Sequence, residues 1–234
     1  MFIICGLLSI LESFAQTFEI KAGVNLSTML SKDDRSTYSG DYTLTPRLLI
    51  GVTTEIPITQ LFSIESGLLF SQKGYKLDKK YTLYSTSEPV PVYTKAVLNY
   101  LEIPFLMKFS HSIFGLPLYG VLGPYAAFGI SGKTITNIYS GAMSASNVYE
   151  NQFNSNGPWK SLDYGLQAGA GITFGKYVFG LNYSYGLANI SRHFPHAEKN
   201  RIIGLTLGYK FKTRNPAHCK LPGKSGFSAS LAEN

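Results

Sequence analysis

The sequence predicts an all-β fold, an antiparallel up-and-down barrel of eight strands. Two observations support this prediction: side chains alternate with period two along successive segments, and the connections between these segments alternate between long and short. The composition agrees, with 16 tyrosines, 15 phenylalanines and 23 glycines in 234 residues. Aromatic residues favour pleated surfaces, and glycine relieves crowding inside strands and barrels. A single all-β domain of this length is ordinary.

The clearest alternation lies in the segment YVFGLNYSYGL, residues 177–187. One face of this segment is bulky and apolar or aromatic, while the other carries Val, Gly, Asn and Ser. The segment RIIGLTLGYKF, residues 201–211, repeats the pattern. The same test along the chain predicts eight strands, at 17–27, 45–57, 61–75, 97–110, 116–131, 159–174, 176–187 and 200–211.

The connections between the predicted strands sort by length. Long polar segments are expected at 28–44, 76–96, 132–158 and 188–199, and short links at 58–60, 111–115 and Gly175-Lys176. Strict alternation of long and short links is typical of a membrane barrel with long extracellular loops and short periplasmic turns. We therefore expect four longer extracellular loops and three short periplasmic turns.

The charged residues of the strands fall on the small, polar face. Five acids and five bases share it: Glu19, Lys21, Arg47, Glu55, Glu65, Lys73, Glu102, Lys108, Asp163 and Lys210. A soluble barrel would have an apolar interior and a polar exterior, whereas here the large apolar residues face outward, which only lipid makes favourable. The interior of eight strands is just filled by side chains. The sequence therefore predicts a transmembrane barrel whose lumen is plugged by a structural polar network.

One segment, NYLEIPFLMKF at residues 99–109, shows why the charges belong to a network. Glu102 and Lys108 share a face but are six residues apart, roughly 20 Å along a strand. They cannot pair with each other, so their partners must come from other strands; Lys21, Arg47, Lys73, Glu65 and Asp163 are the candidates. Pro104 on the same face is expected to mark a local bulge.

The ends of the chain differ in composition from the barrel. Residues 1–15 have an apolar core followed by Ser13-Phe14-Ala15, which predicts a signal peptide cleaved after Ala15. The barrel domain is predicted at 16–211, and residues 212–234 lack periodicity and are expected to form a flexible tail. Only Cys219 would remain after cleavage, so an internal disulfide is not expected. No apolar run is long enough for a spanning helix.

Seven motifs, taken in order, resemble the PorT-like outer-membrane β-barrel family of Bacteroidetes. They are FEIKAGVNLS, SIESGLLFSQKGYKL, YLEIPFLMKF, GPYAAFGISGK, DYGLQAGAGITF, NYSYGLANI and KNRIIGLTLGYKF, and they cover residues 17–211. The resemblance implies location in the outer membrane, contact with its lipid, and assembly by the barrel-assembly machinery with Phe211 as the terminal aromatic signal. The founding member supports protease export, so secretion-system components are a further expected class of partner.

The sequence contains no motif that predicts a catalytic, cofactor-binding or metal-binding site. We expect a structural or accessory role, with surface binding through the long loops as one form of it. Two alternatives stay open: a narrow channel for small solutes, and an outer-membrane enzyme. His193, His196 and Glu198 lie close in the sequence, but their spacing does not match a metal-binding motif. The formal charge of +7 is scattered rather than clustered, so nucleic acid is not an expected partner.

Overall fold

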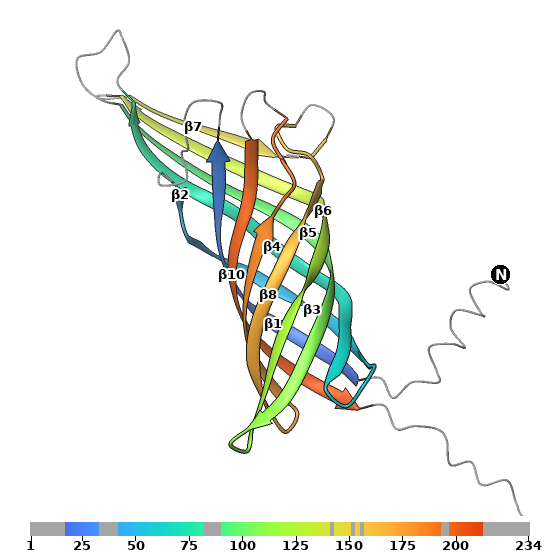
Figure 1. The fold of residues 1–234 in the computed structure, drawn as a ribbon. Helices are drawn as coiled ribbons and strands as arrows, with labels where there is room; N and C mark the ends of the chain where they lie inside the picture. The colour runs from blue at the N-terminus through green and yellow to red at the C-terminus, as the bar shows by residue number, and fades with distance from the viewer. Residues whose placement is uncertain are drawn as a thin grey trace, which may run out of the picture.

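The computed structural model describes residues 17–32, 42–81, 90–140, 143–150, 153–154, 157–192 and 197–212. Within these ranges the chain forms ten β-strands and no helix (Figure 1). The strands are β1 (Thr17–Lys32), β2 (Tyr42–Thr43), β3 (Thr45–Pro57), β4 (Phe62–Tyr81), β5 (Val90–Ile113), β6 (Leu116–Ser140), β7 (Met143–Glu150), β8 (Leu162–Phe174), β9 (Tyr177–Gly186) and β10 (Ala197–Lys212). The described part of the chain thus contains no helix that is long and apolar enough to cross a membrane.

Eight of the ten strands close into a ring. The order is β1-β3-β4-β5-β6-β8-β9-β10, and β10 returns to pair with β1 along their whole lengths. Every neighbouring pair is antiparallel, so each strand is joined to the next along the ring by a simple up-and-down connection. The predicted eight-stranded, up-and-down barrel is confirmed. Closure leaves no unpaired sheet edge around the ring.

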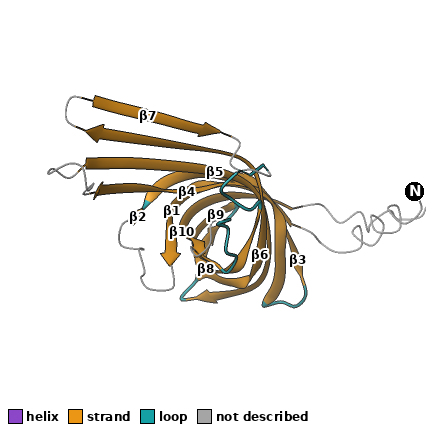
Figure 2. Cartoon of the chain, turned by 90° about the horizontal axis from the view of Figure 1, so that it is seen from above, coloured by secondary structure: helices purple, strands orange, loops and turns teal. Residues whose placement is uncertain are grey.

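Three strands are much longer than predicted, and they extend past the ring on the long-loop side. Residues 76–81, 90–96 and 132–140, expected in long connections, continue β4, β5 and β6, and β7 pairs with the end of β6. We call residues 76–81, 90–97 and 133–140 together with β7 the projecting sheet. Figure 2 shows it reaching out to one side of the ring.

The prediction of loops in this part was wrong because these polar stretches also have a high β propensity. These stretches carry many Thr, Tyr, Val and Ile residues, which fit pleated strands even when neither face enters a core. Smaller differences occur elsewhere: β1 continues to Lys32, and β2 is a two-residue strand within the expected first loop. The predicted sixth strand begins at Leu162 rather than 159, and Trp159 forms an isolated bridge to Ser191.

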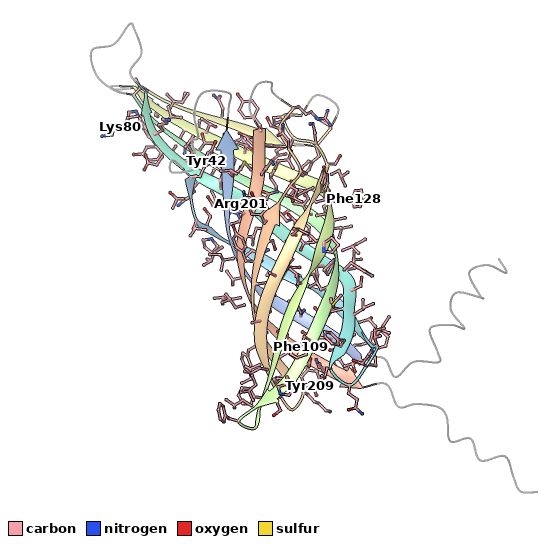
Figure 3. The ribbon with its side chains drawn as sticks, viewed as in Figure 1. Tyr42, Lys80, Phe109, Phe128, Arg201 and Tyr209 are labelled. Atoms are coloured by element: carbon pink, nitrogen blue, oxygen red, sulfur yellow. The ribbon has the colours of Figure 1, made fainter. Side chains whose placement is uncertain are left out.

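The alternation of faces matches the sequence pattern strand by strand. In β9, Val178, Gly180 and Ser184 are buried, whereas Phe179 and Leu181 are exposed. In β5, alternate residues from Tyr100 to Lys108 are buried, and the intervening large apolar residues are exposed. The exposed apolar side chains form an outward belt around the ring, and Figure 3 shows side chains standing out along the strands.

Pro104 does not create the expected bulge. It pairs in register with Tyr125 of β6, and the register shift between β5 and β6 lies instead at Asn99/Tyr100. On its other side the ladder to β4 passes from Ser66↔Phe105 to Leu69↔Glu102 without a shift. Proline lacks an N–H, so it weakens the ladder locally without adding a residue to the strand. The predicted signal peptide and all but the first residue of the predicted tail lie outside the described residues.

Candidate functional site: the filled lumen

All ten charged residues predicted for the lumen face the interior of the ring. Eight are buried, while Glu55 and Lys210, near the end with the short turns, are partly buried. Alternation within each strand places them there, because their neighbours on either side in sequence face outward. The structure divides them into two ion-pair networks and one separate arginine.

The first cluster, which we call the turn-end network, contains Glu19, Lys21, Glu55, Glu65, Lys108 and Lys210. Glu65 accepts Lys21 Nζ at 2.6 Å and Lys108 Nζ at 3.0 Å. Glu55 accepts Lys210 Nζ at 2.9 Å and Lys108 Nζ at 3.2 Å, and its other oxygen accepts the Ser63 hydroxyl at 2.9 Å. Glu19 lies 3.7 Å from Lys21. Three acids and three bases balance, so no net charge is left in this half of the lumen.

The second cluster, the loop-end network, centres on Lys73. Its Nζ lies 2.9 Å from Glu102 Oε2 and 2.9 Å from Asp163 Oδ2. Asn200 donates to the same Asp163 oxygen at 2.9 Å, and the Tyr125 hydroxyl lies 3.5 Å from it. The residues come from β4, β5, β6, β8 and β10, so the network ties together strands on opposite sides of the ring.

Arg47 belongs to neither network. Its Nη2 donates to the backbone oxygen of Ala96 at 2.8 Å, and Nη1 donates to Pro46 O at 3.4 Å. No acid of the described chain lies within ion-pair distance of it. Of the candidate partners expected for Glu102 and Lys108, Lys73 binds Glu102 and Glu65 binds Lys108. Glu102 and Lys108 are not paired with each other.

Aromatic rings lie beneath the lysines, and sequence reasoning did not place them. Lys73 Nζ lies 4.5 Å from the centre of the Tyr125 ring and 5.0 Å from that of Tyr100. Lys108 Nζ lies 4.4 Å from the centre of the Tyr119 ring. A cation over an aromatic face gains electrostatic stabilisation that is larger where water is excluded. Tyr119 and Tyr125 lie in the predicted strand 116–131, where apolar residues occur on both faces, so alternation does not assign these two rings to the lumen.

Beyond the loop-end network, the mouth of the ring is closed by apolar side chains. The cluster comprises Met29, Tyr75, Ala96, Leu98, Tyr100, Tyr125, Ala127, Trp159, Ala188 and Ile190. Trp159 and Ile190 come from the segments after β7 and β9, which are held together by Lys160 N–H donating to Ile190 O at 2.7 Å and Arg192 N–H to Pro158 O at 2.9 Å. These two segments cross the opening and act as an apolar plug.

Little space remains between the two networks. A cavity of about 20 Å³ is lined by residues that include Lys21, Glu65, Glu102, Gln167 and Asn182. A volume of roughly 10–15 Å³ is needed to hold one water molecule, so this cavity has room for one or two. The cavity itself is too small for a solute larger than water. The lumen of the described chain is therefore filled by paired charges, aromatic rings and apolar residues.

The buried charged residues of the lumen are arranged to stabilise the barrel. Unpaired buried charge is expensive, and each lysine here meets the carboxylates that offset its desolvation. The described residues contain no group of three or more His, Cys, Asp or Glu side chains able to hold a metal ion. His193 and His196, two members of the histidine cluster noted in the sequence, lie outside the described residues.

Three solved structures illustrate what the fold is similar to. The attachment invasion locus protein Ail of Yersinia pestis has 14% identity and a TM-score of 0.40, over 85% of this chain and 99% of that one. Neisserial surface protein A has 11% identity and a TM-score of 0.36, over 84% and 97% of the two chains. An outer membrane channel from Pseudomonas putida F1 has 10% identity and a TM-score of 0.30, over 85% and 96%. A search of curated proteins gave no significant match.

A family model described as outer membrane protein beta-barrel domain matches residues 14–192, most of the chain. The match covers the ring from β1 to β9, strands whose outward faces are apolar and whose inward faces carry most of the two networks. The closed ring, its lipid-facing exterior and this match agree, and the chain belongs to the outer membrane protein beta-barrel domain family, located in the outer membrane.

Proposed function

We propose that this protein is a closed outer-membrane barrel that anchors a binding surface outside the cell, without a transport path through its lumen and without catalytic chemistry. The observation that carries the proposal is a contrast within one chain: the lumen is filled, while three of its strands run on past the ring into the projecting sheet. Because outer-membrane barrels have short periplasmic turns and longer extracellular segments, the projecting sheet lies outside the cell.

The filled lumen disfavours the channel alternative. The cavity of about 20 Å³ is bounded on both sides by ion pairs, and the mouth beyond Lys73 is covered by Trp159 and Ile190. Opening a path would require separating buried charges, which is costly when one partner is left unpaired. The enzyme alternative has no support from an accessible constellation of catalytic side chains within the described residues.

The projecting sheet has features of a binding surface for an acidic partner. Lys76 and Lys95 are direct cross-strand partners on its outward face, and both are exposed. Like charges placed opposite each other destabilise a sheet, so an anionic ligand would relieve the repulsion. On the same face, the rings of Tyr93 and Tyr139 meet edge to face at 5.7 Å between centroids. Figure 3 places Lys80 at the far tip of this sheet.

The finer identity of the protein rests on sequence motifs. We place the chain in the PorT-like branch of the family, with residues 1–15 removed on export and the barrel-assembly machinery inserting the rest. An acidic segment of a cell-surface or secreted protein is then the kind of partner that suits the lysines of the projecting sheet. If that partner belongs to a secretion system, the protein has an accessory role in secretion.

The test uses the full chain refolded into lipid nanodiscs and a fluorescent poly-glutamate peptide as the probe. Binding by fluorescence anisotropy should weaken at least several-fold in the Lys76→Gln/Lys95→Gln variant. The control, Lys160→Gln/Lys176→Gln, removes the same charge outside the sheet and should bind as the wild type does. An equal loss of peptide binding in both variants would mean that binding depends only on the net charge of the protein, and it would overturn the proposed surface.

Conductance tests the other half of the proposal independently. In planar bilayers, the refolded wild-type protein should give no steady openings at moderate voltage. Steady, reproducible conductance steps would show a solute path and contradict the closed lumen, whatever the peptide result.

A further inference from the structure

A second site lies on the outer surface of the ring, separate from the lumen and from the lysines of the projecting sheet. A groove of about 350 Å³ runs over β1 and β10, with Thr28, Leu30, Leu44, Tyr183, Arg201 and Ile203 among its lining residues. Its volume is within the range of roughly 300–1,000 Å³ that is usual for small-molecule sites. Figure 3 shows Tyr42, which also lines it, and Arg201 close together near the long-loop end.

The groove lies where the hydrocarbon ends. Arg201 and Phe211 are ten residues apart on the outward face of β10. With about 3.4 Å per residue and a strand tilt near 40°, this corresponds to roughly 26 Å along the membrane normal, close to the height of about 25 Å of the apolar band. Since Phe211 marks the periplasmic rim, Arg201 stands at the outer rim, among the headgroups. Ile203 and Tyr183 below it face the acyl chains.

Arg201 is held in place but retains free hydrogen-bonding capacity. Its guanidinium carbon stacks 3.4 Å from the centre of the Tyr185 ring, and Nη1 donates to Gly186 O at 3.1 Å and Asn200 O at 3.4 Å. Within the described ranges, Nε and Nη2 make no hydrogen bond and no carboxylate lies within 4 Å of the side chain. Lys199 is two residues away on the same face. Among the described residues, the rim of the groove therefore carries positive charge with no carboxylate within 4 Å of Arg201.

An arginine on the outer surface of the barrel, at the level of the lipid headgroups, lies beside the phosphate groups of the lipids. Guanidinium groups bind phosphate oxygens through two parallel charge-assisted hydrogen bonds, and stacking on an aromatic ring orients the fork. On the membrane side of the arginine, Ile203 and its cross-strand partner Tyr183 provide the surface that an acyl chain would cover, while Leu30, the cross-strand partner of Lys199, lies on the loop side. One molecule that has both parts, a phosphate and an acyl chain, is a membrane lipid.

We propose that this groove binds an outer-leaflet lipid whose headgroup phosphate carries a net negative charge, with the phosphate on Arg201 and an acyl chain passing over Ile203 and Tyr183 toward the middle of the membrane. Binding would fix the approach of β1 and β10, the pair of strands at which the ring closes. The site does not depend on the projecting sheet or on what that sheet binds.

The experiment is native mass spectrometry of the full chain released from detergent micelles doped with dimyristoyl phosphatidylglycerol or dimyristoyl phosphatidylcholine. These lipids share acyl chains and differ in headgroup charge. The wild type should retain phosphatidylglycerol in preference to phosphatidylcholine. Arg201→Gln should reduce that preference roughly tenfold, because one charge-assisted phosphate contact is lost. Arg201→Lys should keep part of it.

The control Lys176→Gln removes a cation that also lies over an aromatic ring, 5.8 Å from the centroid of Tyr209, but at the opposite rim. It should retain the lipid as the wild type does. Leu44→Trp, which fills the groove, should reduce retention of both lipids. Unchanged preference in Arg201→Gln, or displacement of the lipid by inorganic phosphate alone, would overturn the proposal. The gel mobility of each variant before and after heating establishes that it is folded.

Discussion

Lys73 and Asp163 are ninety residues apart in sequence, yet Lys73 Nζ lies 2.9 Å from Asp163 Oδ2 and neither side chain has any exposed surface. They stand on β4 and β8, which are not neighbours in the ring, so the ion pair spans the lumen. Glu102 completes the site from β5. A charge buried this deeply is tolerated only while its partners remain, which makes the pair a sensitive test of the lumen network.

Replacing Lys73 with Met should destabilise the barrel by about 3–5 kcal/mol, because Asp163 and Glu102 are left buried without a cation. The measurement is the free energy of unfolding in urea for protein folded into phospholipid vesicles. The triple variant Lys73→Met/Glu102→Gln/Asp163→Asn should recover part of the loss, since no uncompensated charge remains.

The control for this prediction is Lys133→Met on the projecting sheet. Lys133 and Glu150 lie 3.2 Å apart, but their side chains are 49% and 66% exposed. Exposed pairs are worth about 0–1 kcal/mol, so this variant should unfold almost as the wild type does. Equal losses of unfolding free energy in Lys73→Met and Lys133→Met would mean that burial does not determine how much these ion pairs contribute to stability.

A glycine contact near the turn-end network gives a second prediction. A Cβ added at Gly180 would lie 2.7 Å from the Tyr119 hydroxyl and 2.6 Å from Thr206 Oγ1. Gly180→Ala should therefore cost about 1–3 kcal/mol of unfolding free energy through overpacking. Gly120→Ala is the matched control, because the nearest atom to its added Cβ, the backbone oxygen of Gly169, is 3.8 Å away. Equal stability of the two variants would contradict tight packing beneath Lys108.

The sequence predicts those features of the fold that depend on neighbouring residues within one strand, and it does not predict contacts between distant strands. Leu205 and Gly204 differ so much in size and polarity that a single strand identifies its own lipid and lumen faces. The pairing of Lys73 with Asp163 is different, because it depends on the register of five strands, which no local pattern contains. The sequence could list the charged residues of the lumen but not divide them into two networks.

Two other features were out of reach for physical reasons. β7, with the sequence MSASNVYE, has the small polar composition of a loop, and it becomes a strand because β6 offers it a free edge. Tyr119 and Tyr125 sit in a segment where both faces are apolar, since one face meets lipid and the other meets lysine side chains. Alternation is uninformative where both environments accept the same residue types.

The lipid-facing surface gives a third prediction. Leu207 lies near the middle of the outward face of β10 and is exposed. Leu207→Arg should destabilise the folded barrel in vesicles by about 2–4 kcal/mol, the cost of a cation near the bilayer midplane. Leu116→Arg, next to the short turn between β5 and β6, should cost about 0–1 kcal/mol because headgroups and water are within reach. A reversal of this order would mean that the depth of the barrel in the membrane has been assigned wrongly.

The role of Phe211 in assembly is a prediction from the sequence that can be separated from any role in stability. Phe211 is 46% exposed on the outer face, and its ring meets that of Tyr209 at 4.7 Å between centroids. The exposed ring faces the membrane interface, so Phe211→Ala should change the unfolding free energy in vesicles only about as much as Phe174→Ala, which removes another exposed phenylalanine of the same rim. If the assembly machinery recognises the terminal aromatic, the same variant should reach the outer membrane of cells more slowly.

Pulse labelling followed by the heat-dependent shift in gel mobility measures that rate. Phe174→Ala removes an outward, similarly exposed phenylalanine at the same rim but on β8, and it serves as the matched control. Slower assembly of Phe211→Ala alone supports a signal at the end of the barrel. Equal delay in both variants would mean that the rim aromatics act together as membrane anchors, since loss of either ring weakens the same interfacial contact.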